Sequence, residues 1–316
     1  MDADSQSRRQ MLRLAASSMA AMHLAGAETP GLPLCVFSKH LQFLKDEALA
    51  EAAIEIGAEG LDLTVRSEGH VLPERVSTDL PRLVNLLQKK GIKVPMVTTS
   101  IVDASSRYVE EVLSTCSRLG INTYRWAGFK YDANRPILQQ LNELKPPVAG
   151  LAALNKKYKV RAIYHTHSGV GLVGASIWDL NYLLKDFDPA SVAINYDVGH
   201  ATVEGGYGGW INSFRVSESH LGGVALKDFA WVQEKAGTWR ARWKPIGEGM
   251  VRFPQFFGML KKTKFSGPVQ VHFEYPLGGA ESGKTEITIP AHQVLSAMKT
   301  DIRRIREMYA AAARTV

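Results

Sequence analysis

The segment PVQVHFE, residues 268–274, alternates apolar and polar side chains along its whole length. Successive side chains of a strand point to opposite faces, so the three apolar residues share one face and the three polar residues share the other. The polar residues are Gln270, His272 and Glu274. Burying a carboxylate is costly unless a cation or hydrogen bonds compensate for its desolvation. The segment therefore predicts a strand whose apolar face meets outer helices and whose polar face lines the lumen of a barrel.

Seven further short apolar segments precede this one, and helical segments separate them. Strands are expected at residues 34–38, 60–65, 94–99, 122–128, 160–165, 192–197, 223–228 and 268–274. Helices are expected at residues 46–57, 79–90, 104–119, 176–186, 209–219, 253–263 and 291–313, and a further long helical stretch is expected to end at Tyr158. This alternation predicts parallel βαβ units, and eight such units close most economically into a single-domain (β/α)8 TIM barrel. An open doubly wound sheet is the alternative, but no G-x-G-x-x-G turn follows the first strand.

Ionisable side chains gather where the predicted strands end, which is where barrels of this kind carry their chemistry. His165 and His167 end the fifth strand and, two residues apart, face the same side. Other such residues are Lys39 and His40 near the first strand, Asp62, Arg66 and His70 at the second, Asp197 and His200 at the sixth, and Lys227 and Asp228 at the seventh. Each alone would more often be a salt-bridged structural residue. Their coincidence across strands distant in sequence predicts one functional site.

The N-terminal segment, residues 1–27, has the pattern of an export signal. Arg8 and Arg9 precede an alanine-rich apolar run, which Ala25-Gly26-Ala27 closes like a cleavage site. An arginine pair in this context resembles a twin-arginine signal, which implies a periplasmic or otherwise exported protein. An amphipathic first helix is the alternative. We therefore expect a signal at 1–27 and the barrel at 28–316.

Composition restricts the partners of the protein. The 316 residues are 45% hydrophobic and 22% charged, with a formal net charge of +7. Because the lysines and arginines are scattered, this charge favours a solvated basic surface over a nucleic-acid interface. The N-terminal apolar run is too short to anchor the protein stably in a membrane. Cys35 and Cys116 are expected in a strand and an outer helix, as buried apolar side chains without a disulfide. A homodimer or larger assembly is compatible with the sequence.

Four segments resemble a known family. They are YDVGH at 196–200, LKDFAW at 226–231, IGEGMVRFPQFF at 246–257 and GPVQVHFEY at 267–275. They are similar to the xylose isomerase-like barrels, the sugar phosphate isomerase/epimerase superfamily, and the resemblance extends over essentially all of residues 28–316. It implies an enzyme that removes a proton next to a carbonyl of a sugar or keto-sugar, in an isomerisation, an epimerisation, or a related elimination or hydration.

The resemblance also implies a divalent metal held by Glu, Asp, His and Glu at the ends of strands five to eight. Asp197 and Glu274 match two of these positions, but His165 and Ala225 stand where the family has Glu and His. A site of His165, Asp197 and Glu274 would offer mixed nitrogen and oxygen ligands, which suit Mn, Co, Fe or Zn. His200 or His272 could complete it. The alternative is that no metal binds and that Lys227 supplies the positive charge.

The chemistry of the other polar side chains at the strand ends suggests catalytic and substrate-binding roles. Glu274, Lys227 and His200 are the expected catalytic residues, because they could transfer a proton or stabilise an oxyanion. Substrate is expected to contact Arg66, His70, His167 and Trp231. Trp178, at the start of a helix, is expected in the core.

Two other functions are compatible with the sequence. Because His165 and Ala225 replace two ligands of the family, one alternative is a barrel that binds carbohydrate without catalysing a reaction. A nuclease of the endonuclease IV type is less favoured, because it needs a trinuclear zinc site with many more ligands than these strand ends offer.

Overall fold

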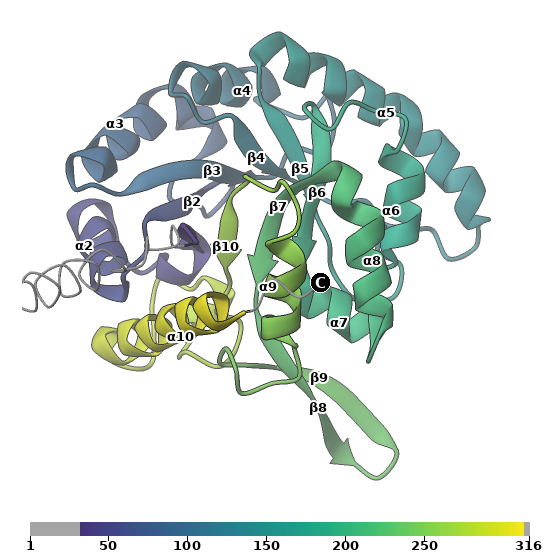
Figure 1. The fold of residues 1–316 in the computed structure, drawn as a ribbon. Coiled ribbons are helices and arrows are strands. Elements are labelled where there is room, and N and C mark those ends of the chain that lie inside the picture. The colour runs from purple at the N-terminus through teal and green to yellow at the C-terminus, as the bar shows by residue number, and fades with distance from the viewer. Residues whose placement is uncertain (1–31, 313–316) are drawn as a thin grey trace, which may run out of the picture. The chain divides into compact units, whose positions relative to one another are not determined.

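The computed structural model describes residues 32–312, and the chain from Pro33 onward belongs to one compact unit (Figure 1). Eight parallel strands close into a barrel in the order β1-β10-β7-β6-β5-β4-β3-β2. Their bounds are β1 Leu34–Phe37, β2 Gly60–Val65, β3 Lys93–Thr99, β4 Thr123–Trp126, β5 Arg161–His165, β6 Val192–Asp197, β7 Leu221–Leu226 and β10 Val269–Val271. Pairing of Leu34 with Val269 and of Val36 with Val271 closes the cylinder. The predicted (β/α)8 barrel is confirmed.

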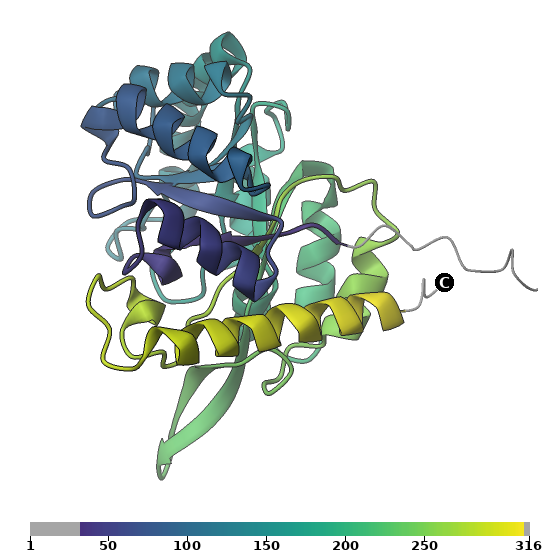
Figure 2. The ribbon, with the colours of Figure 1, turned by 90° about the vertical axis from the view of Figure 1, so that its left-hand side faces the viewer.

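Helices cover the outside of the barrel (Figures 1 and 2). They are α2 Asp46–Ile56, α3 Val76–Lys89, α4 Val109–Arg118, α5 Ile137–Tyr158, α6 Ile177–Leu184, α7 Val198–Gly205, α8 Gly209–Ser217, α9 Phe253–Leu260 and α10 Ala291–Ala311. Short 3-10 turns are η1 Ser38–Leu41, η2 Pro73–Arg75, η3 Glu218–His220 and η4 Ala280–Ser282. The last helix, α10, packs against α2 and α9.

Burial explains why the strands read as apolar runs. All the residues of β1, β2, β6 and β10 are buried, because helices cover one side of each strand and the packed lumen covers the other. Met96, Ile163 and Ala193 form a fully buried cluster. Polar residues reach the lumen nearer the carboxyl ends of the strands, which positions the site described below.

Two elements depart from the sequence-based expectation. An antiparallel hairpin, β8 Asp228–Lys235 and β9 Thr238–Lys244, leaves the barrel after β7 and projects from it (Figure 1). Helix α7 begins directly at the end of β6, without an intervening loop. The expected helices otherwise correspond to observed ones, although α4 begins at Val109 rather than at residue 104.

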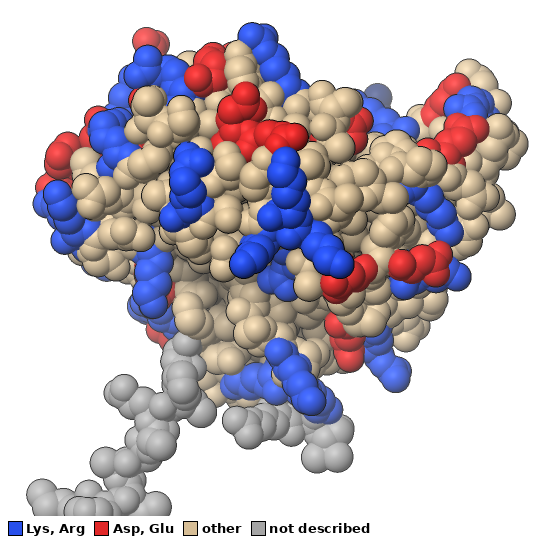
Figure 3. Space-filling model, turned by 90° about the horizontal axis from the view of Figure 1, so that it is seen from above, with Lys and Arg blue, Asp and Glu red and all other residues tan. Residues whose placement is uncertain are grey.

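The described residues also bear on the other expectations. Cys35 in β1 and Cys116 in α4 are buried and free, as predicted. None of the helices in 32–312 is long and apolar enough to cross a membrane. On the face seen in Figure 3, Lys and Arg side chains are interspersed with Asp and Glu. The expected export signal at residues 1–27 lies outside the described residues.

Candidate active site

The carboxyl ends of β5, β6, β7 and β10 bring the predicted catalytic and metal-binding residues together. Alternation in β10 directs Gln270 into the lumen, where its amide exchanges two hydrogen bonds of 3.1 Å with Asn195 of β6. His272 and Glu274 follow on the same side and contact each other at 3.8 Å, from Nδ1 to Oε1. The polar face of PVQVHFE therefore lines the lumen, as predicted.

Asp197 is fixed by the junction of β6 and α7. Its Oδ1 accepts a hydrogen bond of 2.9 Å from the backbone N–H of His200, which makes Asp197 the N-cap of α7. Its Oδ2 points into the lumen, 3.3 Å from His165 Nε2 and 3.3 Å from Lys227 Nζ. Oδ1 thus caps helix α7, and Oδ2 contacts the ionisable groups of the site. Burial raises the pKa of Asp197, but the charge of Lys227 and the hydrogen bond from the His200 backbone outweigh this effect, so that the pKa lies below the ordinary value.

Lys227 lies at the centre of the ionisable groups. Its Nζ donates to His200 Nε2 at 2.7 Å and to Glu274 Oε2 at 3.2 Å. The ammonium also lies 4.3 Å from the centroid of the Trp243 ring, a cation–π distance. Because an ammonium can only donate, His200 Nε2 must accept, and the imidazole proton resides on Nδ1, which faces Ser168 Oγ at 2.8 Å. Lys227 therefore sets the tautomer of His200.

Glu274 is ionised at neutral pH. Burial raises the pKa of its carboxyl, but Lys227, the contact with His272 and Lys39 together take it well below the usual range. The Lys39 ammonium lies 3.6 Å from Glu274 Oε1. The Glu274 side chain keeps 22% of its surface exposed, so solvent or substrate can reach its carboxylate.

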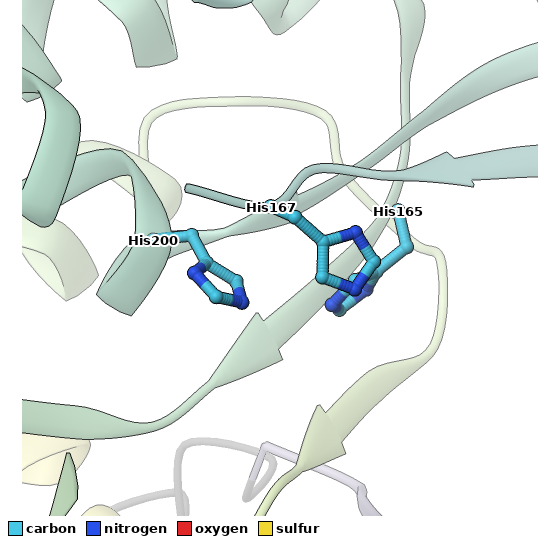
Figure 4. Close-up of side chains that lie close together, drawn as sticks. All are labelled: His165, His167 and His200. Atoms are coloured by element: carbon cyan, nitrogen blue, oxygen red, sulfur yellow. The ribbon is translucent and has the colours of Figure 1, made fainter. Parts of the chain in front are cut away.

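Four histidine rings adjoin these charges. His165, His167 and His200 lie together where β5 and α7 meet (Figure 4), and the ring of His272 stacks on that of His165 at 5.1 Å. Burial and the nearby cations lower the pKa of all four: that of His272 to about 4, that of His167 to about 3, and those of His165 and His200 well below the usual range. All four imidazoles are therefore neutral at pH 7, the form that ligates metals.

Two groups of side chains bring three metal-ligating atoms within 4.8 Å of one another. They are His165, His167 and His200, and His165, Asp197 and His272. In the first group, His167 Nε2 faces Arg125 Nη2 at 3.1 Å and His200 Nε2 accepts from Lys227, so cations already engage two ligand atoms. In the second, only Asp197 Oδ2 is engaged by a cation, the Lys227 ammonium at 3.3 Å, whereas His165 Nε2 and both ring nitrogens of His272 are buried without a hydrogen-bond partner. The second group fits a metal better, since buried polar atoms normally have partners.

This arrangement differs in one ligand from the predicted set of His165, Asp197 and Glu274. The structure brings His272 to the other two residues and places the Glu274 oxygens on Lys227 and Lys39. The reason is that Lys227 lies between the two carboxylates and contacts both.

The predicted substrate-binding residues divide into two pairs. Arg66 and His167 lie at the mouth of the barrel beside Phe37 and Arg125, respectively. His70 instead hydrogen-bonds Thr64 Oγ1 at 3.1 Å behind the end of β2. Trp231 lies out along the hairpin, 6.1 Å from Phe229, and none of its described contacts reaches the site.

Two residues at the mouth, Arg125 and Asn195, were missed from the sequence-based assignment. Arg125 lies between outward-facing Tyr124 and Trp126 in β4, an alternation that resembles that of β10 and could have revealed it. Asn195 precedes Asp197 by two residues and so faces the same side. Trp243 was expected from the sequence as an aromatic residue that could stack on a sugar; in the structure the hairpin folds back and places its ring against Lys227.

A pocket of about 390 Å³ opens beside His167 and His200, between the loop after β5 and helices α7 and α8. Trp178 forms part of its wall and is 59% exposed, which corrects the expectation that it belongs to the core. The reason is that α6 turns its first residues toward the pocket rather than the barrel.

Fold and site together define a (β/α)8 barrel with an ionisable site at the carboxyl ends of its strands. The family model described as xylose isomerase-like TIM barrel matches residues 50–298, and the chain belongs to that family. Solved structures that share this fold include a D-tagatose 3-epimerase-like protein and a D-psicose 3-epimerase. The buried His/Asp cluster is consistent with a metal site of the kind typical of this superfamily.

Solved structures share the fold at low sequence identity. The xylose isomerase domain protein from Planctomyces limnophilus has a TM-score of 0.65 at 14% identity, over 90% of this chain and 100% of its own. L-ribulose 3-epimerase has a TM-score of 0.66 at 12% identity, over 89% and 95%. The probable 3-DHS dehydratase AsbF from Bacillus anthracis has a TM-score of 0.59 at 15% identity, over 86% and 98%. The comparison with curated proteins found no match.

Proposed function

We propose that the protein is an enzyme that removes a proton next to a carbonyl of a sugar or keto-sugar, with a divalent metal held by His165, Asp197 and His272. The reaction would be an isomerisation, an epimerisation, or a related elimination or hydration. Mixed nitrogen and oxygen ligation suits Mn, Co, Fe or Zn. When bound, the metal would polarise the substrate oxygens.

The observation that carries this proposal is the pair of unpartnered histidines beside Asp197. His165 Nε2 and the His272 nitrogens are buried and lack hydrogen bonds, and they lie close to Asp197 Oδ2, whose one cationic partner is Lys227. A buried polar atom without a partner costs free energy comparable to a lost hydrogen bond, and a bound cation would remove that cost for both histidines.

The surroundings of His165 support a ligand role. Its Nδ1 lies 2.9 Å from the Asn195 amide, which is paired with Gln270 through two reciprocal bonds. Exchanging the oxygen and nitrogen positions in both amides keeps that pair intact and turns an acceptor toward Nδ1. His165 then carries its proton on Nδ1 and directs the Nε2 lone pair toward Asp197. Asn195 is thus a positioning residue for His165.

Lys227 and Glu274 would move the proton. Glu274 is ionised, partly exposed and able to accept a proton from a substrate carbon. Ion pairing with Lys227 makes it a weak base. An oxyanion developing on the substrate would attract the Lys227 ammonium, weaken its pairing with Glu274 and make the carboxylate more basic as the reaction proceeds. His200, hydrogen-bonded to Lys227, would keep the ammonium in place.

Metal analysis tests the proposal. Protein purified after exposure to Mn, Co, Fe or Zn should contain about one metal per chain, a content that Asp197→Asn and His165→Ala should abolish. His220→Ala is the matched control, because His220 lies in η3 and contacts Phe187 and Ser219. Activity would then be sought on sugars and keto-sugars. Full metal content in both site variants would refute the assigned ligands.

A second function is favoured by one observation, the position of Lys227. Its ammonium contacts both Asp197 and Glu274 and therefore already neutralises carboxylates of the kind that hold a metal elsewhere in the family. A metal-free barrel that binds carbohydrate without converting it is consistent with that contact. Lack of metal uptake together with sugar binding and no turnover would favour this function. The nuclease alternative gains no such support, because in 32–312 both ligand groups share His165 and so describe one centre.

We also propose that the protein is exported through the twin-arginine pathway. The support is the sequence of residues 1–27, with Arg8-Arg9 before an apolar run. Replacing both arginines with lysine should retain the protein in the cytoplasm, as cell fractionation and immunoblotting would show. An unchanged distribution would refute the route.

A further inference from the structure

Three cations surround the ring of Phe37 at the mouth of the barrel. Lys39 Nζ lies 5.6 Å from the ring centroid, Arg66 Cζ 5.7 Å and Arg125 Cζ 5.5 Å. They come from η1, the end of β2 and β4, so the fold brings them together from distant parts of the sequence. None of the three residues is fully enclosed by surface area, and the Lys39 side chain keeps 18% of its surface exposed.

The carboxylates of the site leave two of these cations without an acidic partner. Glu274 pairs with Lys39 and Lys227, and Asp197 pairs with Lys227. Neither Arg66 nor Arg125 has a carboxylate oxygen within 4.0 Å among residues 32–312. Two neighbouring guanidinium groups that face an open mouth without counter-charges form an anion-binding arrangement.

Asp62 acts electrostatically on both arginines, and Glu68 acts on Arg66, but neither acid lies within ion-pair distance of them. Both Asp62 oxygens accept from Thr98 Oγ1, at 2.9 and 2.8 Å. The side chain is fully buried below the two arginines in the lumen. Asp62 therefore does not form an ion pair with either guanidinium group at the mouth.

We propose that the substrate of this site carries an anionic group, a carboxylate or a phosphate, which Arg66 and Arg125 bind. The inference rests on the proposed function and specifies its substrate class. Arg125 Nη2 is hydrogen-bonded to His167 Nε2, and the His167 ring lies 4.6 Å from that of His165. Arg125 is thus one imidazole, that of His167, away from the metal-ligand cluster, a separation that suits one sugar-sized molecule with its acidic group at one end.

Calorimetry with simple probes tests this inference. Wild-type protein would be titrated with D-gluconate, with D-glucose 6-phosphate and with D-glucose at equal concentrations. We expect at least one of the anionic probes to bind, and D-glucose to bind at least tenfold more weakly. Arg66→Gln and Arg125→Gln should each weaken the anionic probe at least tenfold. Arg125→Lys should give an intermediate loss, because it keeps the charge and loses the bidentate geometry.

Arg303→Gln on the outer face of α10 is the matched control, because it removes the same charge from an exposed position. Binding of gluconate alone assigns a carboxylate, binding of the sugar phosphate alone assigns a phosphate, and binding of both supports the shared anion site. The inference is overturned if neither anion binds better than glucose, or if binding survives both arginine substitutions in variants whose circular dichroism shows a folded barrel. Metal content is measured in a separate experiment. A lack of anion binding would therefore leave the metal-binding proposal intact, and a lack of metal would leave the anion-binding inference intact.

Discussion

Lys227 determines how the charges of the site are arranged. Its side chain is 2% exposed, yet it carries an ammonium that two carboxylates, an imidazole and the face of Trp243 accommodate. Desolvating an ammonium costs several kcal/mol unless partners of this kind surround it. The same contacts keep Glu274 ionised and fix the tautomer of His200. The single residue between β7 and β8 thus couples the protonation states of two side chains from other elements.

Glu274 is the residue on which the catalytic proposal depends most. Glu274→Gln keeps the size of the side chain and removes its charge, so turnover of an identified sugar substrate should fall by at least about 10², a typical contribution of a general acid or base. Folding should survive, because the carboxylate is partly exposed and Lys227 retains Asp197 as a partner. Steady-state kinetics and circular dichroism would measure the two effects.

Glu248→Gln is the control for that experiment. Glu248 pairs with Arg304 at the surface, so its substitution removes the same charge away from the mouth and should leave turnover unchanged. Full activity of Glu274→Gln would show that Glu274 has a structural role, and the assignment of Lys227 and His200 around it would have to be withdrawn.

At the level of elements, the strands were predictable and the connections between them were not. Buried parallel strands leave an apolar or alternating pattern that can be recognised locally, as in PVQVHFE. Helix α7 has eight residues and begins at Val198, directly after the last residue of β6, so no loop marks its start. The β8–β9 hairpin contains Trp231, Trp239 and Trp243, but only its fold shows that Trp243 is the one over Lys227. For the same reason the sequence indicated Asp197 and His165 as ligands but not the choice of His272 over Glu274, which the three-dimensional position of Lys227 decides.

The junction of α7 with β7 leads to a prediction about Gly199. A Cβ at this position would lie 2.7 Å from the backbone oxygen of Lys227 and 2.8 Å from its Cγ. Gly199→Ala should therefore push α7 away from β7 and displace both Asp197 and Lys227. Overpacking of this kind costs about 1–3 kcal/mol, which denaturant unfolding would measure, and metal content should fall with it.

Gly209→Ala provides the comparison, because Gly209 lies exposed in the first turn of α8 with open space around its would-be Cβ. Alanine there should leave stability equal or slightly higher. If both substitutions had the same small effect, the contact between α7 and Lys227 would not constrain the site.

At the scale of the whole molecule, one buried carboxyl links the closing segments of the barrel. Asp301 of α10 accepts from the backbone N–H of Ile246 at 3.1 Å and from the Tyr275 hydroxyl at 2.9 Å. The segment after the hairpin, the end of β10 and the last helix therefore meet at one side chain. Burial raises the pKa of Asp301 to about 7, although its hydrogen bonds oppose the shift.

That raised pKa predicts how the stability of the fold depends on pH. The ordinary carboxyl pKa of 3.8 applies in the unfolded chain, so between about pH 4 and pH 7 folding takes up a proton at Asp301. The contribution of Asp301 to stability is therefore fully present below about pH 4 and is lost as the pH rises through about 7.

Asp301→Asn cannot titrate and should lack this loss of stability. The free energy of unfolding of the variant relative to wild type should accordingly rise by a few kcal/mol from pH 4 to pH 7. Urea unfolding of both proteins at several pH values measures that difference, in which every other titrating group cancels. Parallel stability curves would mean that the pKa of Asp301 is not raised on folding, so that its bonds to Ile246 and Tyr275 stabilise the charged form at least as much as burial opposes it.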